Sequence, residues 1–167
     1  MPGRTGSERM ADRTHHYEVS LEWTGDTGSG TRGYAGYERS HVLSAGDKPP
    51  IPGSSDPHFR GDASRWNPEE LLVGALAACH QLWYLHLCAV NQVTVLAYRD
   101  RASGAMAEHA DGSGEFQRVL LRPDVEIAAG CDPKTAMRLH DEAARLCLLA
   151  RSVSFPVEHE PSIKVRA

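Results

Sequence analysis

Residues 67–80 read NPEELLVGALAACH, and this stretch predicts the start of a long apolar helix. Asn67 is a favoured N-cap residue and Pro68 suits the first helical position. The two carboxylates that follow interact favourably with the positive end of the helix dipole. Apolar residues continue to about residue 90 and surround the helix on nearly every side, so we expect it to be buried in the centre of the domain. Cys79 would then lie midway along this helix.

A second apolar stretch carries Cys147. Asp132 and Pro133 predict another helix start, and this helix should reach about residue 150. Free cysteine is among the most buried residue types, so each thiol taken alone is explained as part of the core. The sequence around the two thiols also suits a redox site. Two interpretations of Cys79 therefore stay open at this point, a buried apolar residue or a nucleophile.

The remaining segments predict strands and turns. Residues 17–23 alternate between apolar and polar side chains, which is typical of a half-buried strand, and residues 34–43 would pair with them in a hairpin. Residues 44–66 are rich in proline and glycine, so we expect a long surface loop without regular structure. Further strands are expected at 93–102, 118–128 and 157–165. The order β-β-α-β-β-α-β predicts an α+β fold.

The length of 167 residues predicts a single domain over residues 17–167, preceded by a polar, flexible tail over residues 1–16. A net charge of −4 with scattered basic residues argues against nucleic acid as a partner. We expect no membrane partner, because polar residues interrupt the apolar stretch 71–87. Four cysteines without an apolar leader segment favour a reducing compartment, so we expect a cytoplasmic location.

Two motifs resemble those of the OsmC/Ohr family, the osmotically inducible and organic hydroperoxide resistance proteins. The letters NPEELL at 67–72 and AAC at 77–79 resemble the family's first cysteine region, and CLLARSV at 147–153 is similar to its second. The resemblance extends over about residues 17–163. It implies an α+β fold with antiparallel sheets around two central buried helices, and an intertwined homodimer.

The resemblance also implies an activity. It predicts an oxidoreductase, a cysteine-based peroxidase that reduces organic hydroperoxides as an antioxidant in the oxidative stress response. Cys79 would be the peroxidatic thiolate and Cys147 the resolving thiol, because a sulfenic acid must condense with a second thiol before it is oxidised further. No cofactor is implied, and an external dithiol of the dihydrolipoamide type would reopen the disulfide.

A peroxidatic thiolate at Cys79 needs a nearby cation, since a free thiol is mostly protonated at neutral pH. Cys79 lies roughly 15 Å along the axis from Glu69 at about 1.5 Å per residue, too far for help from the helix dipole. In the family an arginine of the N-terminal hairpin serves this purpose; Arg32 matches its place best, and Arg39 is the alternative. The resemblance gives Glu69 the role of holding this arginine, and we expect it to act across the dimer interface.

Other interpretations remain open. The chain could be an OsmC-like dimer that binds a ligand or has a structural role without catalysis, or the same thiols could perform another thiol chemistry. Cys88 and Cys131 have no matching context, so we expect both to be structural. Trp83 and Tyr84 belong either to the core or to apolar pocket walls. His80 and His86 lack the paired short spacing of zinc ligands.

Overall fold

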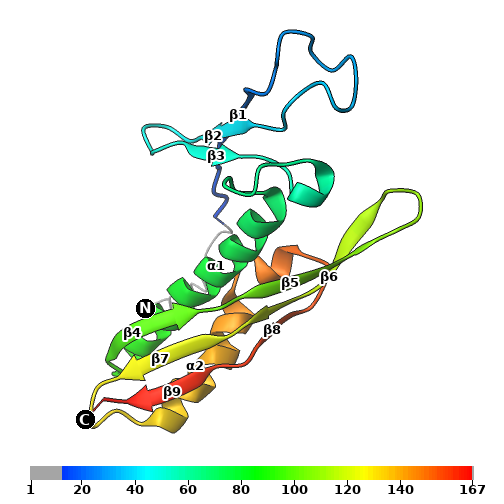
Figure 1. The fold of residues 1–167 in the computed structure, drawn as a ribbon. Helices are drawn as coiled ribbons and strands as arrows, with labels where there is room; N and C mark the ends of the chain where they lie inside the picture. Colours follow the sequence, from blue (N-terminus) through cyan, green and yellow to red (C-terminus); the bar gives the residue numbers. More distant parts are fainter. Residues whose placement is uncertain (1–12, 167) are drawn as a thin grey trace, which may run out of the picture. The chain divides into compact units, whose positions relative to one another are not determined.

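The computed structural model describes residues 13–166, which form two compact units that divide between Arg65 and Trp66 (Figure 1). Residues 1–12, most of the predicted tail, lie outside the described residues. Whether residues 17–167 behave as a single domain stays a prediction. We describe each unit by itself.

The first unit contains a three-stranded antiparallel sheet in the order β1-β2-β3. Its strands are β1 (Ser20–Trp23), β2 (His41–Ser44) and β3 (Ile51–Gly53), followed by the short 3-10 helix η1 (Pro57–Phe59). The predicted hairpin is confirmed, but its second strand starts at His41 rather than at residue 34. The expectation of no regular structure in residues 44–66 is wrong. Pro52 cannot donate a backbone hydrogen bond, yet β3 accommodates it because β3 is an edge strand.

The second unit contains two helices, α1 (Pro68–Val90) and α2 (Pro133–Leu146). The predicted start of α1 is confirmed as a complete capping box. The Asn67 side chain accepts a hydrogen bond from the Glu70 backbone N–H at 2.7 Å, and the Glu70 carboxylate accepts one from the Asn67 N–H at 3.3 Å. Such a cap stabilises a helix by about 1 kcal/mol. The α2 helix ends at Leu146, earlier than predicted, and is followed by the 3-10 helix η2 (Ala150–Ser152).

Two three-stranded sheets complete the second unit, in the orders β4-β7-β9 and β5-β6-β8. Their strands are β4 (Val95–Asp100), β5 (Ser103–Glu108), β6 (Gly114–Leu121), β7 (Pro123–Ile127), β8 (Val157–His159) and β9 (Ser162–Val165). The chain runs from β4 into β5, from β6 into β7 and from β8 into β9, so the two sheets continue each other along one ribbon (Figure 1).

The sheets of the second unit are mixed, not purely antiparallel as predicted. β4 pairs with β7 and β5 with β6 in antiparallel fashion, whereas β8 pairs with β6 and β9 with β7 in parallel fashion. The parallel pairs arise because α2 lies between β7 and β8 and returns the chain to the end of the ribbon from which β6 started. The α+β class is thus confirmed with this correction.

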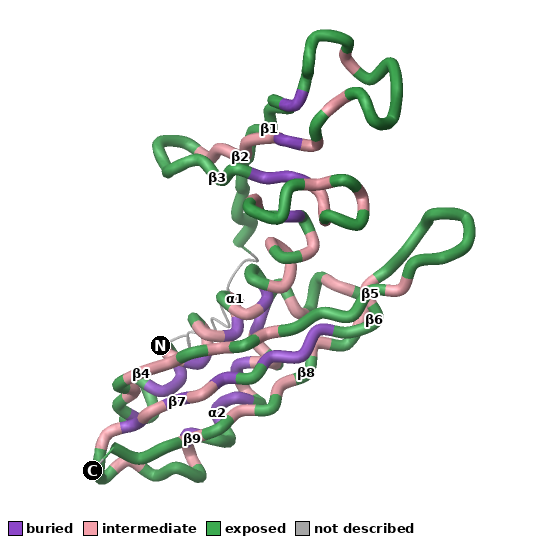
Figure 2. Tube along the Cα trace, in the orientation of Figure 1, coloured by how far each residue is buried: buried purple, intermediate pink, exposed green. Residues whose placement is uncertain are grey.

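The core lies where both helices pack together and against the ribbon (Figure 2). One cluster joins α1, α2 and β7 through Tyr84, Leu139 and Ile127, and a second joins α1 to β6 through Leu76 and Val119. Within the single chain α1 is buried along one stripe, not on all sides as predicted.

The outer side of α1 stays exposed. The side chains of Leu82 and Val90 keep 66% and 61% of their surface accessible. By length and composition alone α1 could cross a membrane. That is weak support for a membrane span, because the core helix of a soluble protein passes the same test.

Candidate active site

The first thiol of the site is positioned by α1. Cys79 lies near the middle of this helix and is a free, half-buried thiol. The capping box fixes where α1 begins, and the buried stripe that starts at Leu76 fixes how the helix is rotated against the ribbon. Cys79 is therefore held half-buried at the edge of the packed face.

The second thiol comes from the end of α2. Cys147 is the C-cap residue of this helix, its side chain is 1% exposed, and its backbone N–H still donates to the Ala143 carbonyl at 2.9 Å. Its Sγ accepts a hydrogen bond from the Ala150 N–H at 3.4 Å. The early end of α2 therefore turns the following segment back over the sulfur.

The structure brings the two thiols together. Cys79 lies close enough to Cys147 to affect its ionisation, although the first thiol comes from α1 and the second from the end of α2. Burial raises the pKa of the Cys147 thiol to about 11, and the hydrogen bond and charge interaction with Cys79 add to this rise. Cys147 is thus a protonated thiol at neutral pH, beside a second sulfur that is more accessible.

The predicted carboxylate lies apart from the thiols. Glu69 is in the first turn of α1, so about three helical turns separate it from Cys79, roughly 15 Å along a helix axis. Its Oε2 atom is buried and has no hydrogen-bond partner among the described residues. A buried carboxylate oxygen without a partner is costly, so the site is suited to a cation.

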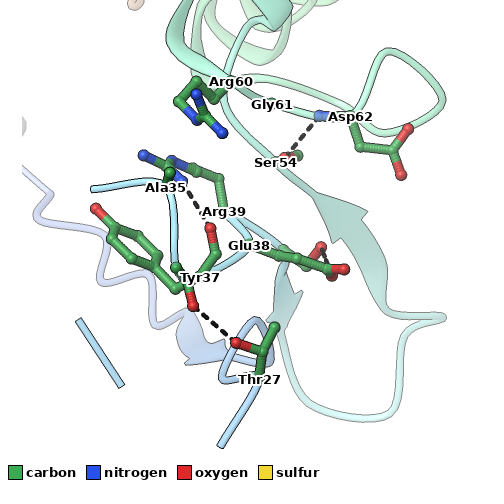
Figure 3. Close-up of a pocket in the computed structure, with 11 residues that line it drawn as sticks. Thr27, Ala35, Tyr37, Glu38, Arg39, Ser54, Arg60, Gly61 and Asp62 are labelled. Carbon is green, nitrogen blue, oxygen red and sulfur yellow. Dashed lines mark hydrogen bonds between the residues drawn. The ribbon is translucent and has the colours of Figure 1, made fainter. Parts of the chain in front are cut away.

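Both predicted arginines belong to the first unit, whereas both thiols belong to the second. Arg39 is held rigidly: its guanidinium donates to the carbonyls of Tyr37 at 2.6 Å and Tyr34 at 2.7 Å and lies over both rings. Arg39 and Arg60 line a hollow of about 600 Å³ in the first unit (Figure 3). Arg32 lies exposed in the loop between β1 and β2.

Three neighbouring histidines, two of which line a cavity together with Cys147, were missed as a group by the sequence analysis. His80 and His140 are buried, with His80 Nε2 and His140 Nδ1 joined by a hydrogen bond of 3.0 Å. The His159 ring lies 5.5 Å from that of His80, centroid to centroid. Burial lowers the pKa of His80 to about 4 and that of His140 to about 3, with further lowering by the neighbouring imidazoles.

A sequence signal for two of these histidines exists. His80 follows Leu76 and precedes Tyr84 by one helical turn each, on the buried stripe of α1. His140 lies one turn beyond Ala136 on the buried stripe of α2, and its ring stacks on Tyr84 at 3.8 Å between centroids. A histidine on an apolar helix stripe therefore indicated that its ring makes a buried polar contact. The spacing of residues along the chain could not show that His80 and His140 are each other's partners.

The remaining candidates are now placed. Tyr84 belongs to the core, and Trp83 packs against the same cluster while also lining a hollow on α1 with Leu82 and His86. Cys88 is buried in the core cluster, and Cys131 packs against it. Among residues 13–166, no group of three or more His, Cys, Asp or Glu side chains has the geometry for a metal ion.

The fold and the thiol pair define an α+β protein in which a cysteine in the middle of one helix, Cys79, lies near a cysteine at the end of the other, Cys147. Residues 61–162 match the family described as OsmC-like protein, and the chain belongs to this family. A comparison with curated proteins finds no match.

Solved structures share the fold over nearly the whole chain. An OsmC-like protein of unknown function from Vibrio cholerae is 26% identical, with a TM-score of 0.80 over 89% of this chain and 100% of its own. An organic hydroperoxide resistance protein OsmC from Legionella pneumophila is 14% identical, with a TM-score of 0.66 over 92% and 99%. One from Elizabethkingia anophelis is 13% identical, with a TM-score of 0.64 over 92% and 100%. The last two show the fold alone.

The buried histidines predict how stability depends on pH. Because the pKa values of His80 and His140 are lower in the folded chain than in the unfolded one, the unfolded chain binds more protons between about pH 6.5 and pH 4. The contribution of the two neutral histidines to the free energy of unfolding should therefore be fully present above pH 6.5. It should fall as the pH drops, by about 1 kcal/mol per pH unit for each histidine. Urea denaturation at pH 6.5 and pH 5 measures this slope.

Variants assign the slope to the cluster. His140→Gln should make it shallower, whereas His109→Gln, at an exposed loop position, should leave it unchanged. An unchanged slope in His140→Gln would contradict the prediction.

Proposed function

We propose that the protein is a thiol-dependent peroxidase that reduces organic hydroperoxides, with Cys79 as the peroxidatic thiolate and Cys147 as the resolving thiol. The observation that carries the proposal is the contact between these two thiols. Membership of the OsmC-like family supports it, as does the shared fold with organic hydroperoxide resistance proteins.

The reaction would proceed in three balanced steps. The Cys79 thiolate attacks a peroxide oxygen; the S–O bond forms, the O–O bond breaks, and the alkoxide takes a proton to leave as an alcohol. The Cys147 sulfur then attacks the Cys79 sulfenic acid; the S–S bond forms, the S–O bond breaks, and water leaves. An external dithiol of the dihydrolipoamide type finally reduces the disulfide by exchange and becomes a disulfide itself.

The unequal environments of the two thiols support this division of roles. Cys79 is half-buried, so a peroxide can reach it, whereas Cys147 is buried and its pKa is raised. A peroxidatic cysteine must be accessible and ionised, and a resolving cysteine only needs to reach the sulfenic acid. The reverse assignment would place the nucleophile where neither requirement is met.

Activation of Cys79 would come from a hairpin arginine held by Glu69. The buried, unpartnered Oε2 of Glu69 supports this, because a guanidinium would supply the missing hydrogen bonds. Arg32 is the first candidate by its place in the hairpin. Arg39 is the alternative, and its fixed guanidinium is in its favour.

A second copy of the chain is the partner we propose for the exposed side of α1. Leu82 and Val90 leave apolar surface on a helix whose opposite stripe is already packed. Burial of such surface is favourable by about 25 cal/mol per Å². Within a homodimer, Glu69 of one subunit and the thiols of the other could share one site. We also propose that the protein acts in the cytoplasm, where reduced thiols persist.

A non-catalytic OsmC-like dimer is the second candidate. The fold by itself does not separate the two candidates, because it is shared with an OsmC-like protein of unknown function from Vibrio cholerae as well as with organic hydroperoxide resistance proteins. In a non-catalytic dimer the thiols would react with peroxide no faster than free cysteine, and a stopped-flow measurement of thiol oxidation separates the two functions.

Cysteine variants test the peroxidase directly. With cumene hydroperoxide and dihydrolipoamide, Cys79→Ser should abolish peroxide consumption, because it removes the nucleophile. Cys147→Ser should permit one turnover and then stop, and mass spectrometry of the unmutated protein should find the Cys79–Cys147 disulfide. Cys131→Ser serves as the control and should keep full activity. Consumption that persists in Cys79→Ser would refute the proposal.

Arginine variants identify the activating cation. Arg32→Ala should lower the rate of Cys79 oxidation at pH 7 by roughly 10-fold or more, because it removes the cation that would stabilise the thiolate. Glu69→Gln should reduce the same rate, and raising the pH should partly restore both variants. If Arg39→Ala alone slows the reaction, Arg39 is the activating residue instead.

Sedimentation velocity tests the homodimer. The protein should sediment at twice the chain mass of 18.3 kDa, and Leu82→Glu should shift it toward the monomer by placing a charge on the apolar side of α1. Met137→Glu, an exposed position on α2, is the matched control and should leave the dimer intact. A monomer at micromolar concentration in the unmutated protein would rule the dimer out.

A further inference from the structure

Cys147 faces a small enclosed cavity of about 10 Å³, which has room for about one water molecule. Most of its lining is aliphatic, with Leu76, Leu121 and Val157 among the residues. Among residues 13–166, the polar side chains that line it, besides the Cys147 thiol, are those of His80 and His159. A proton that leaves the Cys147 sulfur into this cavity can therefore be received by one of these imidazoles, directly or through one water.

His159 has the arrangement of a proton acceptor. It ends β8, and because side chains alternate along a strand, Val157 and His159 face the cavity while Glu158 points to the other side. The Nε2 of His159 lies 3.0 Å from Oδ1 of Asp141. A carboxylate can only accept a hydrogen bond, so Nε2 carries the hydrogen and Nδ1 of the neutral ring is left as the base.

His80 lines the same cavity but is a poorer acceptor. Its Nε2 is already hydrogen-bonded to His140, and burial lowers the pKa of His80 to about 4. His140, behind it, is fully buried, and no carboxylate contacts either ring among the described hydrogen bonds and ion pairs. His159, in contrast, has a carboxylate partner, and 19% of its own side chain and 79% of that of Asp141 are accessible.

We propose that His159, oriented by Asp141, is the proton acceptor for the Cys147 thiol when the disulfide forms. Nδ1 takes the proton as the Cys147 sulfur attacks the Cys79 sulfenic acid. The imidazolium returns the proton to the departing hydroxide, which leaves as water, so no net proton is consumed. The inference rests on the proposed peroxidase function and assigns a residue to its second step.

The test follows the two steps separately. Fully reduced, full-length protein is mixed with one equivalent of cumene hydroperoxide, and samples are quenched with a sulfenic acid trap and analysed by mass spectrometry. In His159→Gln the Cys79 sulfenic acid should form at the rate of the unmutated protein, whereas the disulfide should form roughly 10- to 100-fold more slowly. A solvent deuterium isotope effect on disulfide formation should be present in the unmutated protein and lost in His159→Gln.

A second variant guards against a merely structural effect. Asp141→Asn changes only an exposed side chain, so the fold should be preserved, and disulfide formation should slow several-fold because the imidazolium loses its carboxylate. His109→Gln is the matched control and should behave as the unmutated protein. Disulfide formation at the original rate in His159→Gln or in Asp141→Asn would overturn the inference. Absence of both the sulfenic acid and the Cys79–Cys147 disulfide in the unmutated protein would instead refute the peroxidase function itself.

Discussion

The packing of α1 against α2 is the constraint on which the site depends. Leu139 and the small side chains of Ala136 and Ala143 let α2 approach α1 closely, against Tyr84 and its neighbours. Only this approach brings a thiol from the middle of one helix to a thiol at the end of the other. Without it, the chain would hold two unrelated cysteines, each of which is ordinary as part of a core.

The same packing makes the two thiols unequal. Cys147 lies where the end of α2 is covered by the following segment, so burial raises its pKa, while Cys79 stays at the edge of the packed face. The histidines show the same effect in the opposite sense, since burial keeps His80 and His140 neutral. Desolvation thus separates the roles of chemically similar groups. The two histidines between the helices are therefore uncharged, whereas the carboxylate that pairs with His159, that of Asp141, is exposed at the surface.

Features with strong local signals were predicted well. The start of α1 follows from Asn67 and Pro68, since capping and fixed backbone angles act within a few residues. Features with weak local signals were missed. The strand β5 was not predicted, because its sequence SGAMAE is poor in β-branched and aromatic residues, and it forms because β6 pairs with it. The end of α2 was misjudged because the apolar residues after Cys147 continue the pattern, while the backbone at Cys147 is already extended.

The sequence by itself determined the α+β class, both helix starts, and the resemblance that singled out Cys79 and Cys147. Capping, periodicity and motif spacing are local properties, so the order of residues is enough to reveal them. Only the tertiary structure decided that the two sulfurs meet, that His80 pairs with His140, and that His159 and Asp141 lie at the same cavity. These contacts join segments far apart in the chain, and their geometry is set by how whole helices and strands pack, which no local pattern encodes.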